Sequence, residues 1–238
     1  MSAPYHTIPL TPLRKIIAAR MTEAKQTIPH YRVCMDIQMD ALLALRQHLN
    51  ADNLQNKVSV NDLIIKACAT TLMEQPALNC QFIDNEIHQY QQADIAVVMA
   101  VDGGLSTPII KNANHKTVQD IARNINDLAG RAQQGTLKMN EIVGGSFSIS
   151  NLGMFGVDQF DAIINPPQCA ILAVGAARPQ PVVKNGSVQT ANLMRASLSL
   201  DHRVIDGATG AQFLSALREL LQHPEALVTA LTSNRSIA

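Results

Sequence analysis

The chain has 238 residues, of which 47% are hydrophobic and 16% charged, so it is long enough to bury a full core as one large domain or two small ones. It carries 19 basic and 19 acidic residues, and this balance argues against nucleic-acid binding and against an anionic membrane as partner. No apolar run reaches membrane-spanning length, and the 4 cysteines lack metal-binding spacing. We therefore expect no metal, no membrane contact, and reduced thiols in the cytoplasm.

The first part of the chain predicts three helices and one amphipathic strand. Thr11 and Pro12 are typical of a helix start, and residues 31–39 alternate apolar and polar side chains as a half-buried strand does. Ser59 is a predicted cap, with the acidic Asp62 in the first turn of its helix. The predicted elements are a helix over 8–26, the strand over 31–39, a helix over 40–49 and a helix from 59 to 75.

The rest of the chain mixes strands and helices without regular alternation. Residues 95–101 form a continuous apolar run, which predicts a strand buried on both faces, turned at Gly103-Gly104 into a partner strand over 105–110. Asn185-Gly186 predicts a type I′ hairpin turn. The other predicted elements are short strands on either side of residues 84–85, helices over 117–134 and 208–222, a last helix from 224, and strands over 146–150, 170–174 and 194–200. This order favours one α+β domain with a mixed sheet.

A histidine at the end of the last predicted strand is the strongest candidate for chemistry. The alternating run 194–200 leads to His202, and Asp206 and Gly207 follow just before a helix. A strand that delivers a histidine to its edge, near a carboxylate, is one way in which a fold presents a general base, because imidazole titrates near neutral pH. A lone histidine in such a place is more often structural, so the motif alone leaves both interpretations open.

A second candidate stretch, residues 144–156, is rich in glycine, serine and asparagine. Ser148, Ser150 and Asn151 lie in or next to the predicted strand, and a hydroxyl there can donate to a developing oxyanion. The alternative is a glycine-rich turn whose serines cap backbone groups. The chain contains no phosphate-loop pattern, no Gly-x-Ser-x-Gly elbow and no zinc-binding cluster.

Five separated segments carry a resemblance to one family. They are residues 14–18, 28–31, 148–153, 162–168 and 201–207, the last of which reads Asp-His-Arg-Val-Ile-Asp-Gly. On these segments the chain resembles the catalytic domain of dihydrolipoamide acyltransferases, the core components of 2-oxo acid dehydrogenase complexes, over about residues 8–227. Residues 151–156 and 160–168 are most similar to the acetyl-transferring, pyruvate dehydrogenase members.

The resemblance implies a fold, a site and a chemistry. The fold would be a two-layer sandwich like that of chloramphenicol acetyltransferase, with a trimer as the unit and the active site between subunits. The substrates would be coenzyme A and a lipoyl group, with no metal. His202 would be the general base and Ser150 the oxyanion donor, with Ser148 as a rival donor on the same strand face. Asp206, which many members replace with asparagine, would lie beside His202 and pair with Arg14. Gly207 and Asn151 would support the site.

The resemblance also implies partners and an organisation of the chain. Residues 1–10 are expected to be a tail or linker remnant, 11–231 the acyltransferase domain and 232–238 a polar tail. The polar residues from 229 onward are expected to weaken the joining of trimers into a larger core. A lipoyl domain, supplied in trans or by a missing N-terminal part, a 2-oxo acid decarboxylase and dihydrolipoamide dehydrogenase are the implied partners. The alternatives are a stand-alone acyltransferase with a carrier-protein or small-molecule acceptor, and a non-catalytic scaffold, which would be expected to lose His202.

Overall fold

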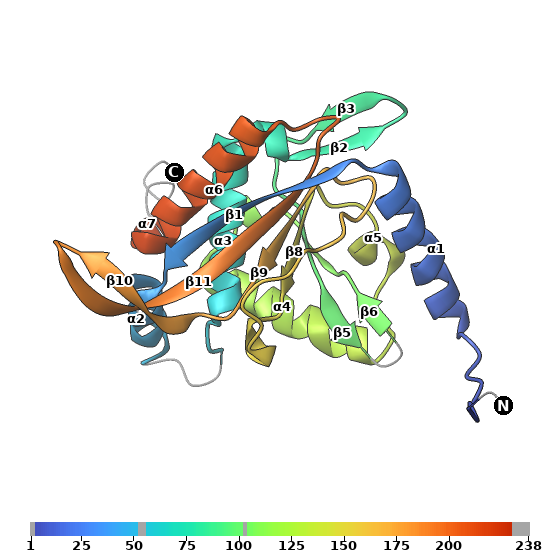
Figure 1. Cartoon of the computed structure of the whole chain (residues 1–238), viewed down its shortest axis with the longest axis horizontal. Helices are drawn as coiled ribbons and strands as arrows, with labels where there is room; N and C mark the ends of the chain where they lie inside the picture. The colour runs from blue at the N-terminus through green and yellow to red at the C-terminus, as the bar shows by residue number, and fades with distance from the viewer. Residues whose placement is uncertain (1–2, 52–55, 102–103, 230–238) are drawn as a thin grey trace, which may run out of the picture.

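The molecule is a mixed β-sheet with helices packed on one face (Figure 1). The computed structural model describes residues 3–51, 56–101 and 104–229. The central sheet has seven strands in the order β1-β11-β9-β8-β4-β7, with β10 attached to β11. The pairs β4–β8 and β8–β9 are parallel, and the other pairs of this sheet are antiparallel. The expected α+β class with a mixed sheet is confirmed.

The elements have the following bounds. The central strands are β1 (His30–Gln38), β4 (Ile95–Val97), β7 (Ile109–Ile110), β8 (Phe147–Asn151), β9 (Ala170–Val174), β10 (Arg178–Lys184) and β11 (Ser187–Asp201). Two small hairpins lie outside this sheet, β2 (Cys80–Ile83) with β3 (Glu86–Gln89) and β5 (Met99–Val101) with β6 (Gly104–Ser106). The helices are α1 (Pro12–Thr27), α2 (Asp40–Asn50), α3 (Val60–Glu74), α4 (Val118–Gln133), α5 (Met139–Ile142), α6 (Gly207–Gln222) and α7 (Ala226–Thr229).

The two faces of the central sheet differ in chemistry. One face packs against α2, α3, α4 and α6 and forms the main core, to which the strands contribute Ile149, Leu172, Leu198 and Leu200. On the other face, β1 exposes Arg32, Cys34 and Asp36, and the neighbouring strands carry serines. A second, smaller apolar cluster, which includes Ala24, Ile28, Ile164 and Ile171, lies apart from the main core, and Ile171 joins it from β9. The alternation predicted for β1 is therefore present.

Local signals fix several element boundaries as predicted. Ser59 and Asp62 form a reciprocal capping box at the start of α3, with Asp62 N–H donating to Ser59 Oγ at 3.1 Å and Ser59 N–H donating to the Asp62 carboxylate at 2.8 Å. Asn185 and Gly186 have φ angles of 51° and 76°, as the turn between β10 and β11 requires. The Thr11 side chain caps α1.

Three predicted elements need correction. The helix expected over 8–26 begins at Pro12. The apolar run 95–101 is not one strand, because β4 ends at Val97, whose pairing with β8 closes with the Val98 N–H donating to the Ile149 carbonyl at 2.9 Å, and a separate strand begins at Met99. Only β4 stays in the buried sheet, while β5 pairs with β6 outside it and is only half buried. Of the predicted turn Gly103-Gly104, Gly103 lies outside the described residues and Gly104 is the first residue of β6. Finally, β11 runs unbroken for 15 residues, longer than the predicted 194–200.

Candidate active site

His202 lies on a tight turn that begins where β11 ends. Its backbone N–H donates to the Pro29 carbonyl at 3.2 Å and so extends the pairing of β11 with β1, while the N–H groups of Val204 and Ile205 close the turn on the Asp201 carbonyl. His202 itself is exposed. The backbone around the imidazole is therefore fixed, while the ring is open to solvent and substrate.

The residues on either side of His202 clamp this turn. Asp201 is 1% exposed, and its carboxylate accepts hydrogen bonds from the Arg203 backbone at 3.0 Å and from the Arg203 guanidinium at 2.7–3.1 Å. The guanidinium also lies 4.5 Å from the centre of the Phe82 ring, a favourable cation–π distance. A buried carboxylate satisfied in this way holds the backbone of the turn in one conformation.

Two groups lie near the imidazole. The Tyr31 ring is tilted 55° to the His202 ring, with their centroids 4.6 Å apart. Asp206 is the N-cap of α6, and its carboxylate accepts the Thr209 N–H at 2.8 Å. These helix-terminal hydrogen bonds, and to a smaller extent the nearby His202, hold the pKa of Asp206 below its usual value. Asp206 therefore stays anionic near the imidazole while it caps the helix.

The two candidate oxyanion donors on β8 differ in what they bond. Ser148 is fully buried and its hydroxyl donates to the Gln168 side-chain oxygen. The Gln168 amide nitrogen donates to the Gly144 carbonyl at 3.2 Å, which orients the oxygen toward Ser148. Ser150 is 9% exposed, and no hydrogen bond joins its hydroxyl to another described residue. Of the two, Ser150 has the hydroxyl that is available to a ligand.

His202 and Ser150 are separated within one chain. Strand register aligns Ser150 with Ala173 and Ala173 with Ser197, and His202 lies five residues beyond Ser197. At about 3.4 Å per residue this is roughly 17 Å along the sheet. The side chains also lie on opposite faces, because His202 contacts Tyr31 on the helix-covered side, whereas Ser150 alternates with the core residue Ile149.

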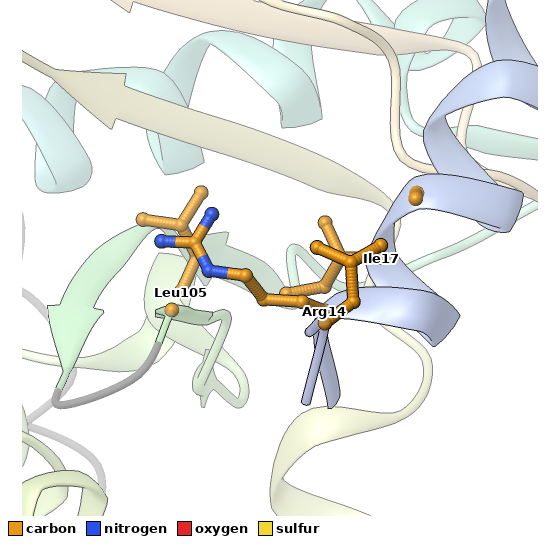
Figure 2. A pocket seen from close by; sticks show the side chains of 6 residues that line it. Arg14, Ile17 and Leu105 are labelled. Carbon is orange, nitrogen blue, oxygen red and sulfur yellow. The ribbon is translucent and has the colours of Figure 1, made fainter. Parts of the chain in front are cut away.

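Arg14 does not reach Asp206 within the chain, so the expected pair of these two residues is not formed. Figure 2 shows the Arg14 side chain extending from α1 toward Leu105, in a cavity of about 410 Å³ that Leu10, Ile17, Ala18 and Gly104 also line. The start of α1 lies far from the start of α6 (Figure 1). Asp206 bonds Thr209 instead, because a helix N-cap needs its own acceptor at this position.

The two residues expected to support the site have local structural surroundings. The Asn151 side chain accepts the Gly153 N–H at 2.9 Å and donates to the Asn61 side chain at 3.1 Å, which fixes the turn after β8. Gly207 is the first residue of α6, and a Cβ added there would meet no described atom within 4 Å. The single chain therefore gives no steric reason for glycine at 207.

A second cavity, of about 290 Å³, is lined in part by Asp201 and Arg203, the residues on either side of His202. Its lining includes Arg20, Glu23, Phe82, Pro167 and Arg203, so it is more polar than the cavity at Arg14. The Arg20 guanidinium donates to the Pro166 carbonyl at 2.7 Å. Within the described part of the chain no group of three His, Cys, Asp or Glu side chains is arranged to hold a metal ion, and no helix there is long and apolar enough to cross a bilayer.

Two features of the site were not predicted from the sequence. The sequence shows opposite charges at Asp201 and Arg203, but it does not show that the Asp201 carboxylate is buried. Tyr31 stands 171 positions before His202 in the sequence, and only the pairing of β1 with β11 brings the two rings together. In the sequence, Tyr31 stands out only as part of the segment 28–31, which resembles the family, and this resemblance does not indicate a role for Tyr31.

Comparisons with known proteins agree with this geometry. The catalytic-domain model of the 2-oxoacid dehydrogenase acyltransferases matches residues 2–229. The dihydrolipoyllysine-residue acetyltransferase component of the pyruvate dehydrogenase complex of Zymomonas mobilis is 46% identical over 223 residues, which are 93% of this chain and 51% of that protein. A solved cubic core of the pyruvate dehydrogenase multienzyme complex is 31% identical, with a TM-score of 0.90 over 94% of each chain. Chloramphenicol acetyltransferase, 14% identical, aligns with a TM-score of 0.54 over 85% of this chain and 94% of its own.

The fold thus defines a class, the domains that share the architecture of chloramphenicol acetyltransferase. Within that class, the chain belongs to the family of 2-oxoacid dehydrogenase acyltransferases, whose catalytic domain it matches. It spans about half the length of the curated relatives it matches.

Proposed function

We propose that this chain transfers an acetyl group between coenzyme A and a dihydrolipoyl group, with His202 as general base and Ser150 as oxyanion donor. The observation that carries the proposal is the exposed imidazole of His202 on a turn clamped by Asp201 and Arg203. An exposed base on a rigid backbone is what proton transfer to and from a bound thiol needs. The family's acetyltransferase members support the choice of acyl group.

The chemistry is a thioester exchange. His202 takes the proton of the dihydrolipoyl thiol, and the resulting thiolate, which is the nucleophile, attacks the thioester carbonyl of acetyl-coenzyme A. The carbonyl oxygen becomes an oxyanion, to which the Ser150 hydroxyl donates. When the tetrahedral intermediate collapses, the coenzyme A sulfur leaves and takes the proton from the imidazolium. The products are coenzyme A and acetyl-dihydrolipoamide, and the reverse reaction follows the same steps.

The separation of His202 and Ser150 requires a second copy of the chain. Because the two groups lie on opposite faces and roughly 17 Å apart along the sheet, a bound thioester cannot touch both in one subunit. We propose a trimer in which each site combines His202 of one subunit with Ser150 of the next. The cubic core formed by a similar protein supports self-assembly.

The wider setting follows from the same family. The partners proposed are a lipoyl domain, a 2-oxo acid decarboxylase and dihydrolipoamide dehydrogenase, as in a pyruvate dehydrogenase complex. Three buried free cysteines, Cys68, Cys80 and Cys169, fit a reducing compartment such as the cytoplasm. A carrier-protein thiol or a small-molecule hydroxyl is the alternative acceptor, and a non-catalytic scaffold is the alternative role.

An acceptor panel tests the proposal. Initial rates of acetyl transfer from acetyl-coenzyme A are measured with free dihydrolipoamide, a lipoyl domain, a carrier-protein thiol and chloramphenicol. We expect transfer to the first two, and a loss of about 10²–10⁴-fold in the His202→Ala variant. His88→Ala, which removes another exposed histidine, is the matched control and should keep wild-type activity. Preference for the carrier protein or chloramphenicol, or a His202→Ala variant with more than half of its activity, would overturn the proposal.

A further inference from the structure

Tyr31 contacts the candidate base more closely than its place in the sequence suggests. It lies in β1 opposite Leu200, and its ring centre is 4.6 Å from that of His202. No hydrogen bond joins the His202 imidazole to another described residue, and the Tyr31 ring packs against it. An exposed histidine side chain without such a contact would exchange among rotamers.

The phenol of Tyr31 is itself held in place. Its hydroxyl donates to the Asp206 backbone carbonyl at 2.5 Å, and Asp206 caps α6 through Thr209. Burial, and then the charge of Asp206, raise the pKa of Tyr31 to about 12. The phenol therefore remains a hydrogen-bond donor at neutral pH. In this way Tyr31 links strand β1, the first turn of α6 and the His202 ring.

We infer that Tyr31 is a positioning residue for acyl transfer, whose ring holds the His202 imidazole in the orientation that receives the thiol proton. The inference rests on the proposed function and adds to it a residue that acts through His202. A base that spends less time in the productive orientation lowers the rate of the chemical step, whereas the binding of either substrate is not affected. Tyr31 is thus expected to act on kcat rather than on KM.

Three variants distinguish the effect of the Tyr31 ring contact with His202 from that of the Tyr31 hydroxyl and from a general loss of stability. Tyr31→Leu removes both contacts, and Tyr31→Phe removes only the hydroxyl. Tyr90→Leu is the matched control, because the Tyr90 hydroxyl donates to the Gln81 side chain at 2.8 Å, and among the described residues the ring that contacts His202 is that of Tyr31. We expect kcat to fall about 10-fold in Tyr31→Leu, with both KM values within about 2-fold. Tyr31→Phe should recover most of this loss, and Tyr90→Leu should match the wild type.

Several results would overturn the inference. They are an unchanged kcat in Tyr31→Leu, an equal loss in Tyr31→Phe and Tyr31→Leu, an equal loss in Tyr90→Leu, or a change confined to KM. If Tyr31→Leu does not assemble, Tyr31→Met, which fills more of the same volume, replaces it. If the wild-type protein transfers no acetyl group to dihydrolipoamide, the proposed function is contradicted instead. The wild-type rate alone shows this, so the two kinds of failure are distinguishable.

Discussion

Ser148 and Ser150 lie two residues apart on the same face of β8, yet their hydroxyls have different partners. Ser148 donates to Gln168 inside the protein, so using it as an oxyanion donor would break a buried hydrogen bond. Ser150 has no such bond to a described residue. A preorganised donor contributes most when it need not give up another partner at the moment of reaction. This difference separates two serines that strand alternation alone cannot distinguish.

The pair gives a matched test. We expect Ser150→Ala to lower kcat by about 10²-fold, with little change in KM for coenzyme A, because an oxyanion donor acts in the transition state. Ser148→Ala should keep most of its activity per folded molecule but lose about 1–3 kcal/mol of stability, because Gln168 is left without its donor. Steady-state kinetics and urea unfolding of both variants provide the measurement. A larger kcat loss in Ser148→Ala would reverse the assignment.

The Tyr31 phenol should ionise at a higher pH than an ordinary tyrosine. Its folded-state pKa is raised to about 12 from 10.0, so the folded state favours the neutral phenol. The resulting stability is fully present below pH 10 and is lost as the pH rises from 10 to about 12. At about pH 11 an ordinary phenol is roughly nine-tenths ionised, whereas Tyr31 should be roughly one-tenth ionised. The difference in phenolate absorbance between wild type and Tyr31→Phe measures this, and a difference that titrates near 10 would contradict it.

At the scale of elements, the close packing of α6 on the sheet requires a glycine at position 210. A Cβ at Gly210 would overlap the Leu200 side chain and come within 3.3 Å of the Tyr31 hydroxyl and 3.5 Å of Val33. These atoms belong to β11 and β1, so the helix packs closely on the two strands that carry Tyr31 and lead to His202. Gly130, in α4, is exposed and has no atom within 4 Å of its added Cβ.

The two glycines predict opposite effects of the same substitution. Gly210→Ala should destabilise the protein by about 1–3 kcal/mol through overpacking. Gly130→Ala should stabilise it by about 0.5–1 kcal/mol, because alanine loses less backbone entropy in a helix. Urea-unfolding midpoints of both variants against the wild type decide the matter. Equal stability of the two variants would mean that the contact between α6 and β11 is looser than described.

Local sequence patterns predicted much of the fold and pointed to the segments of the candidate site. The capping boxes at Ser59 and Thr117 and the turn at Asn185-Gly186 are encoded within a few residues, and so is the strand that leads to His202. The site segments were found because their motifs are contiguous in the sequence. For these features, one sequence was enough.

What could not be predicted depends on contacts between distant segments. The run 95–101 looks like one strand, and only the parallel pairing with β8 and the separate hairpin of β5 and β6 divide it. Tyr31 reaches His202 only through the pairing of β1 with β11. For the same reason the sequence did not show that Arg14 and Asp206 lie apart within one chain, since no local pattern tells where the start of α1 lies against the rest of the molecule.

At the scale of the whole molecule, one chain leaves surfaces that a second copy would cover. In α1 only Ala24 is buried, while Leu13 and Ile16 are 43% and 63% exposed. A 16-residue helix with so little burial gains little stability from its own chain. These exposed apolar side chains and the separation of His202 from Ser150 both fit an assembly of several subunits.

Mixing inactive subunits tests the central claim most directly, namely that each site takes His202 and Ser150 from different chains. His202→Ala and Ser150→Ala chains, carrying different tags, are produced together, and the mixed oligomers are purified through both tags. Every trimer that carries both tags contains one interface, out of about three, that combines an intact His202 with an intact Ser150, so the purified trimers should recover about a third of wild-type activity. A mixture of His202→Ala with the His202→Ala/Ser150→Ala double variant should stay inactive. If the first mixture is no more active than its better parent, the two groups do not meet across an interface and the account is wrong.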